Sequence, residues 1–187
     1  AAAAADGKAS GAREGQYGSA ESAESGYFES YAKLAIHEEM LSDHTRTQGY
    51  KDAIMRNASL IRGKVVLDVG CGTGILSMFC AQAGAAHVVA VDASDIVGMA
   101  KRIVSANKLA DRITVLRGTM ETVDVLGALP AGVSTVDVII SEWMGYALLY
   151  ESMLPSVLWA RDKYLAPTGV VLPTACDMLL SLSAHHR

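Results

Sequence analysis

The sequence has little of several features that would assign it to a specialised class. Its 187 residues include three cysteines, Cys71, Cys80 and Cys176, none of them in a C-x-x-C pair. This small, odd number argues against a disulfide framework or a structural zinc site and favours a reducing, intracellular compartment. No apolar run approaches the ~18 residues of a membrane-spanning helix, and the first residues lack the apolar core of a signal peptide. We therefore expect no metal and no membrane partner.

Basic residues are not in excess either. Lys and Arg number 16 against 20 Asp and Glu, which gives a net charge of -4 at pH 7. A chain without a broad basic surface is not expected to bind nucleic acid directly, although basic peptides are not excluded as substrates. Hydrophobic residues, in contrast, make up 51% of the chain. They are sufficient to bury the core of one domain of ordinary size.

The chain changes character along its length. Of residues 1–25, seventeen are Ala, Gly or Ser, and such a stretch cannot offset its ordering entropy by burial, so we expect a disordered tail. Helical spacing follows over residues 27–36, 37–41 and 45–60. Strand patterns then alternate with helix patterns, with strands at 64–69, 87–91, 113–116, 136–140 and 169–172, and helices at 75–83, 96–107 and 148–165. This alternation predicts an α/β fold with a parallel sheet and flanking helices.

A glycine-rich turn follows the first predicted strand. Residues 68–74 read D-V-G-C-G-T-G, and Asp92 closes the next strand. In open α/β sheets ligands bind at the carboxyl ends of the strands, where glycines allow close approach and a carboxylate can accept hydrogen bonds from ribose hydroxyls. The dinucleotide fingerprint G-x-G-x-x-G is not matched, because the third glycine comes one residue early. Asp68 would repel a pyrophosphate and attract an α-amino group, so the turn favours S-adenosylmethionine over NAD.

Two glutamates follow the fourth predicted strand. Glu142 comes directly after the strand, and Glu151 lies beyond a turn at Gly145. Two carboxylates in one pocket are costly unless a cation lies between them, and a planar guanidinium suits that place. The alternative is a pair of solvated loop and helix-cap charges, but the surrounding Trp143, Met144, Tyr146 and Met153 are too apolar for a solvated loop. We therefore expect both glutamates to face one pocket and to hold a guanidinium.

Four segments resemble motifs of the protein arginine N-methyltransferases. Residues 141–154 resemble their double-glutamate loop, and residues 27–31 their N-terminal helix motif; residues 37–47 resemble the segment that closes over the cofactor, and residues 66–76 the first methyltransferase motif. The resemblance covers residues 27–175 and is closest to the asymmetric, type I branch. It implies a Rossmann-like class I methyltransferase fold, with N-terminal helices closing over the cofactor. It also implies a location in the cytoplasm, the nucleus or both.

The implied reaction is methyl transfer from S-adenosylmethionine to a guanidino nitrogen of arginine. The substrates would be arginine-containing proteins or peptides, such as histones or Arg/Gly-rich proteins, and the product S-adenosyl-L-homocysteine. By resemblance Glu142 and Glu151 form the catalytic pair. The walls of the arginine channel would be Tyr27, Tyr31, Met40 and Met153.

The resemblance assigns the cofactor contacts as well. Arg46 would pair with the methionyl carboxylate, Asp68 would lie near the amino group, and Asp92 would take the ribose hydroxyls. The other implied contacts are Phe28 and His37, Gly70, Cys71 and Gly72 of the turn, Ala93, and Met120 and Glu121 at the adenine.

This sequence departs from the family pattern in two places. The ribose acid is commonly Glu, whereas here it is Asp92, whose shorter side chain is expected to weaken or reposition the contact. The family also has a C-terminal β-barrel with a Thr-His-Trp loop, and no Thr-His-Trp occurs in this chain. We expect residues 26–175 to form the cofactor-binding domain and residues 176–187 to begin a missing barrel or to form a loose tail. A homodimer is expected for a full-length relative, and that expectation does not extend to this chain.

Three alternatives stay open. A truncated methyltransferase fold could bind the cofactor or an active relative while having weak or no activity of its own. An NAD-dependent oxidoreductase would bind nicotinamide. A small-molecule methyltransferase would leave the paired glutamates unexplained.

Overall fold

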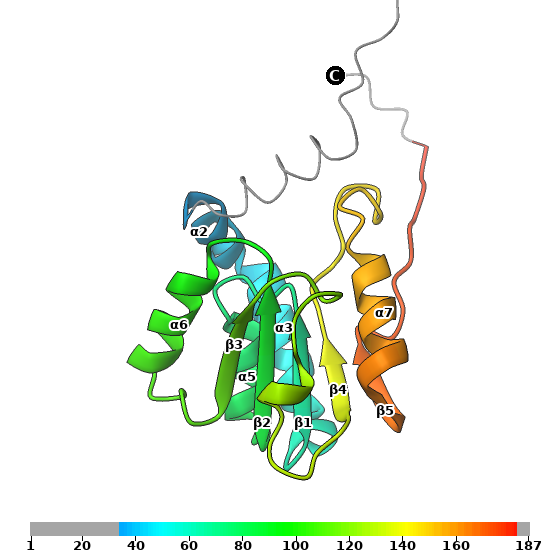
Figure 1. Ribbon diagram of the computed structural model, residues 1–187. Coiled ribbons are helices and arrows are strands. Elements are labelled where there is room, and N and C mark those ends of the chain that lie inside the picture. The colour runs from blue at the N-terminus through cyan, green and yellow to red at the C-terminus, as the bar shows by residue number, and fades with distance from the viewer. Residues whose placement is uncertain (1–33, 183–187) are drawn as a thin grey trace, which may run out of the picture.

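The computed structural model describes residues 34–182, which form a central sheet covered by helices on both faces (Figure 1). Its five strands are β1 (Val65–Val69), β2 (His87–Asp92), β3 (Ile113–Arg117), β4 (Val136–Ile140) and β5 (Leu165–Leu172). Their order in the sheet is β3-β2-β1-β4-β5, and every neighbouring pair is parallel. The predicted α/β fold with a parallel sheet is thus confirmed. The tail predicted over residues 1–25 lies outside the described residues.

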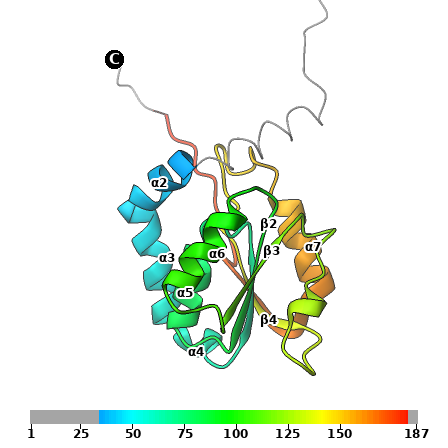
Figure 2. The same cartoon turned by 60° about the vertical axis from the view of Figure 1, so that its left-hand side comes forward.

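Helices cover the two faces unequally. Helices α3 (His44–Arg56), α5 (Ile75–Gln82) and α6 (Val97–Ala106) lie on one side of the sheet, and α7 (Leu154–Tyr164) lies on the other (Figure 2). The remaining helical elements are α2 (Leu34–Ser42), the one-turn α4 (Ala58–Ile61) and the short 3-10 helix η1 (Leu126–Ala128). No described helix has the length and apolar character that a membrane span requires.

Strand β1 lies in the middle of the core. All five of its residues are buried, and successive side chains point to opposite faces, so that Val66 packs under α3 and α5 while Leu67 packs under α7. A strand covered on both faces needs a continuous apolar run rather than an alternating one. The one exception in the run is Asp68, which is also fully buried.

The strand order places the ligand-binding edge of the sheet. Strand β2 pairs with one edge of β1, and β4 pairs with the opposite edge of β1. At such a switch in strand order the loops beyond the carboxyl ends diverge and leave a crevice. The loops after β1, β2, β3 and β4 therefore meet above the same edge.

Several predicted elements have different bounds in the structure. The boundary predicted between helices 27–36 and 37–41 is absent, since residues 34–42 form the single helix α2. The strand predicted over residues 169–172 begins earlier, at Leu165. The helix predicted over residues 45–60 is split at Asn57, whose side-chain amide donates to the carbonyl of Ala53 at 2.8 Å. The helix predicted from residue 148 begins at Leu154, with Pro155 in its first turn. Before it, Ala147, Leu148 and Ser152 have positive φ values of 47°, 65° and 54°, which a helix does not allow. The segment that carries Glu151 is therefore a loop.

Gly74 begins α5 in the left-handed region, with φ of 86°. We predict that Gly74→Ala lowers the free energy of unfolding by about 1 kcal/mol, because a Cβ strains this backbone conformation. The matched control is Gly49→Ala in α3, where a Cβ meets nothing within 4 Å and the substitution should raise stability by roughly 0.5–1 kcal/mol. Urea denaturation of both variants checks the opposite signs; equal shifts would contradict the prediction.

Candidate active site

The glycine turn after β1 has a backbone that only glycine adopts without strain. Gly70 and Gly72 have φ values of 72° and 54°. The turn is fixed to the next strand, because the amides of Gly70 and Cys71 both donate to the carbonyl of Val91, at 2.9 and 3.0 Å. A Cβ on Gly70 would collide with the Met153 side chain, and one on Gly72 would lie 3.1 Å from Cε1 of His37. The glycines thus allow Met153 and His37 to pack against the turn, and all four residues line one cavity.

That cavity has a volume of about 940 Å³ and lies over the carboxyl ends of β1 to β4. Its size is in the range of pockets that enclose a cofactor-sized ligand. Most of the residues proposed for the site on sequence grounds line it, namely His37, Met40, Arg46, Gly70, Cys71, Gly72, Asp92, Ala93, Met120, Glu121, Glu142, Glu151 and Met153. The three aromatic residues proposed from the N-terminal motif, Tyr27, Phe28 and Tyr31, lie outside the described residues.

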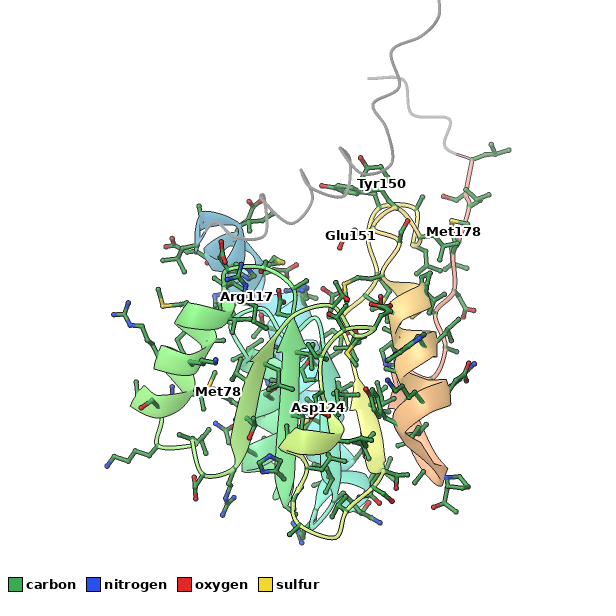
Figure 3. The ribbon with its side chains drawn as sticks, in the orientation of Figure 1. Met78, Arg117, Asp124, Tyr150, Glu151 and Met178 are labelled. Atoms are coloured by element: carbon green, nitrogen blue, oxygen red, sulfur yellow. The ribbon has the colours of Figure 1, made fainter. Side chains whose placement is uncertain are left out.

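Glu142 and Glu151 line the same cavity, as predicted. They come from the end of β4 and from the loop that rises between β4 and α7, where Figure 3 labels Glu151 beside Tyr150. Gly145 makes room for this arrangement, because a Cβ there would lie 3.0 Å from the Glu151 carboxyl carbon. The loop is more exposed than its apolar residues predict: Trp143 is buried, but Tyr146 and Tyr150 are 84% and 76% exposed.

Glu142 already binds a guanidinium in this structure. Its Oε2 accepts a hydrogen bond from Nε of Arg46 at 3.0 Å and makes a very short contact with Nη2 of the same side chain. Nη1 of Arg46 donates to the carbonyl of Met40 at 3.4 Å. The family resemblance assigns Arg46 to a cofactor carboxylate, and this ion pair is not predictable from the sequence because the two residues are 96 positions apart.

The carboxylate of Asp92 joins two loops. Its Oδ2 accepts from the backbone amide of Gly72 at 2.8 Å, and its Oδ1 accepts from the amide and the hydroxyl of Ser94 at 2.8 and 2.7 Å. These donors fix the carboxylate at the edge of the cavity, where it could bind a ribose. Ser94 was not found by sequence reasoning, since a serine after a strand has no distinctive signal.

The expectation for Asp68 is corrected by its position. Its side chain does not line the cavity. It is fully buried beneath the turn, where Oδ2 accepts from the amide and hydroxyl of Ser77 at 3.0 and 2.6 Å, while Oδ1 has no hydrogen-bond partner. Burial raises the pKa of Asp68 to about 7, although the Ser77 hydrogen bonds act in the opposite direction. Asp68 therefore anchors the start of α5 rather than contacting a ligand directly.

Other lining residues were not anticipated. Ser156 of α7 lines the cavity and donates to Glu121 Oε1 at 3.1 Å, so it connects α7 to the segment after β3.

Two titratable side chains near the cavity have raised pKa values. Tyr50 lies just outside the cavity and donates to the Ser141 carbonyl at 3.4 Å; burial and the negative charge of Glu142 raise its pKa well above the usual range. Burial likewise raises the pKa of the Cys71 thiol, which disfavours a nucleophilic role. Among residues 34–182 no cluster of His, Cys, Asp or Glu is arranged to hold a metal.

Comparison with known proteins agrees with this geometry. The family model of ribosomal protein L11 methyltransferase (PrmA) matches residues 43–157. That match, with the parallel sheet and the glycine turn, defines the chain as a methyltransferase domain with a Rossmann-like fold.

Relatives of the chain are named as arginine methyltransferases. Protein arginine N-methyltransferase 1 of Schizosaccharomyces pombe is 59% identical over 155 residues, 83% of this chain and 44% of that protein. The probable protein arginine N-methyltransferase 6 of Arabidopsis thaliana is 57% identical over 159 residues, 85% of this chain and 35% of that protein. The chain belongs to the protein arginine N-methyltransferase family, which decides against the oxidoreductase alternative. It spans less than half the length of these relatives.

Solved structures give the same assignment. The Trypanosoma brucei PRMT1 enzyme-prozyme heterotetrameric complex with AdoHcy matches with a TM-score of 0.71 and 52% identity, covering 77% of this chain and 43% of that one. Arabidopsis thaliana protein arginine methyltransferase 10, solved in an open conformation, matches with a TM-score of 0.73 and 47% identity, covering 79% and 40%.

The burial of Asp68 predicts a specific pH dependence of stability. Its pKa of about 7 in the folded chain lies above the 3.8 of an exposed aspartate, so the native state binds more protons between these values. Its contribution to the free energy of unfolding therefore decreases as pH rises through this window. Between about pH 5 and pH 7.5, Asp68 should lower the free energy of unfolding of the wild type by on the order of 2 kcal/mol. We expect the Asp68→Asn variant not to show this decrease. Urea denaturation at both pH values measures it; parallel profiles for the two proteins would contradict the raised pKa.

Proposed function

We propose that this chain binds S-adenosylmethionine and acts in methyl transfer to a guanidino nitrogen of arginine in proteins. The observation that carries the proposal is the guanidinium of Arg46 on the Glu142 carboxylate, in a cavity that Glu151 and the glycine turn also line. A carboxylate that binds one guanidinium has the chemistry to bind another.

The charge of the cavity supports a cationic ligand. Four carboxylates, Asp92, Glu121, Glu142 and Glu151, line it together with one arginine. A sulfonium with an α-amino group and a substrate guanidinium are both cations, and both would lower the repulsion among these carboxylates. A pyrophosphate, in contrast, would add negative charge.

The residues present fit the cofactor. The glycine turn presents backbone rather than bulky side chains to the cavity, and a Cβ at Gly70 would collide with the end of the Met153 side chain. Asp92 would hold ribose hydroxyls, Glu121 would accept from the adenine amine, and Arg46 would offer Nη1 to the methionyl carboxylate. When bound, S-adenosylmethionine supplies an electrophilic methyl group.

Glu142 and Glu151 would activate and orient the arginine. Free guanidinium is protonated at neutral pH, with a pKa above ~12, so its nitrogen is a poor nucleophile. Two carboxylates would concentrate the positive charge on the nitrogens that they bind and leave electron density on the attacking nitrogen. One of them would accept the proton that this nitrogen releases. Most of the rate gain would come from orientation and electrostatics.

A second candidate function is that of a methyltransferase fold that binds the cofactor or an active relative without efficient transfer of its own. The Trypanosoma brucei complex, which contains an enzyme and a prozyme, supports this alternative. Arginine-containing proteins as substrates, a homodimer of a full-length relative, type I product specificity and a cytoplasmic or nuclear location stay proposals.

Glu142→Gln tests the catalytic assignment. With an Arg/Gly-rich peptide and labelled S-adenosylmethionine, we expect the variant to lose at least about 100-fold in transfer rate, as when a transition-state hydrogen-bonding group is removed. Affinity for S-adenosylhomocysteine, measured by calorimetry, should change only a few-fold. Glu39→Gln, on the exposed side of α2, is the matched control and should transfer normally.

The outcomes separate the two functions. Transfer by the wild type that survives in Glu142→Gln would overturn the role of Glu142. Cofactor binding without any transfer by the wild-type chain would favour the non-catalytic alternative. Absence of S-adenosylhomocysteine binding would overturn the proposed function and the cofactor-binding form of the alternative.

A further inference from the structure

The Asp92 carboxylate is held by donors from two different loops. Gly72 of the β1–α5 turn donates its amide to Oδ2 at 2.8 Å. Ser94 of the β2–α6 loop donates its amide and its hydroxyl to Oδ1, at 2.8 and 2.7 Å. An ionised carboxylate offers about four lone-pair sites, so these three bonds fix its plane and leave acceptor capacity on Oδ2.

Ser94 is built into this position. Its side chain is 3% exposed and does not line the cavity, so it cannot itself contact a ligand there. Its hydroxyl bond to Oδ1 is the kind of short, charge-assisted hydrogen bond that is stronger than a neutral one. Without it, a carboxylate could turn about its last side-chain torsion, which for Asp is broad.

The short side chain makes this orientation important. Asp92 has one methylene less than the glutamate expected at the ribose position, so it cannot reach further to compensate for a rotated carboxylate. A positioning group is then needed to keep Oδ2 presented to the cavity.

We propose that Ser94 is a positioning residue that orients the Asp92 carboxylate for ribose recognition. The inference rests on the proposed function, since it requires an adenosine-containing ligand in this cavity. Ser94 acts through Asp92 and takes no part in the chemistry of methyl transfer.

The test compares ligands with and without ribose hydroxyls on the 187-residue chain. We expect Ser94→Ala to weaken binding of S-adenosylhomocysteine by about tenfold, the size of one hydrogen bond to a charged group. The 2′,3′-dideoxy analogue of S-adenosylhomocysteine should bind the wild type more weakly than the natural ligand does. Its affinity for Ser94→Ala should equal its affinity for the wild type, because the analogue has no ribose hydroxyls for Asp92 to hold. Calorimetry measures all four affinities.

Two further variants keep the test decisive. Ser105→Ala, an exposed serine of α6, is the matched control and should leave both affinities unchanged. Ser94→Cys keeps the volume close to serine with only a weak donor, so it should show the same selective loss if the alanine variant does not fold.

Each result is informative. An equal loss of affinity for both ligands in the Ser94 variants would indicate a general structural role for Ser94 and overturn the proposal. Unchanged affinity for both ligands would also overturn it. If the wild type fails to bind S-adenosylhomocysteine, the proposed function itself is overturned. If the wild type and Ser94→Ala bind it equally well, only the role of Ser94 is overturned.

Discussion

Complete burial of β1 between β2 and β4 is the constraint on which the rest of the structure depends. Because β1 is covered on both faces and paired on both edges, its carboxyl end cannot shift relative to its neighbours. The loops that follow β1, β2 and β4 are then brought to one edge of the sheet. Those loops carry the glycine turn, Asp92 and Glu142, which are distant in sequence and line a single cavity.

The site is organised by carboxylates in different states of solvation. Asp68 is enclosed beneath the turn, with one oxygen unpaired and a raised pKa, and it stabilises the start of α5 through Ser77. Asp92 and Glu142 lie at the cavity surface and are held by donors. A carboxylate therefore serves as a buried anchor in one place and as a cavity-facing acceptor in another, because burial and hydrogen bonding differ.

The parts of the site whose chemistry is local could be predicted from the sequence. The glycine turn and the acid at the end of β2 are visible in a few consecutive residues, and both line the cavity. Two predictions at the site were wrong. The segment predicted as a helix from residue 148 is a loop up to the start of α7 at Leu154, and Ala147, Leu148 and Ser152 have positive φ there. Asp68 was expected beside a ligand, but α5 packs over it and its carboxylate turns to Ser77.

By itself, the sequence determined the α/β alternation, the parallel sheet and the pairing of a glycine turn with two glutamates, because periodicity and residue chemistry act over short distances. Tertiary structure decided which side chains meet. Arg46 reaches Glu142 across 96 positions, and Ser94 and Gly72 close on Asp92 from separate loops. Such contacts depend on how the packed sheet aligns its loops, and no local pattern encodes that alignment.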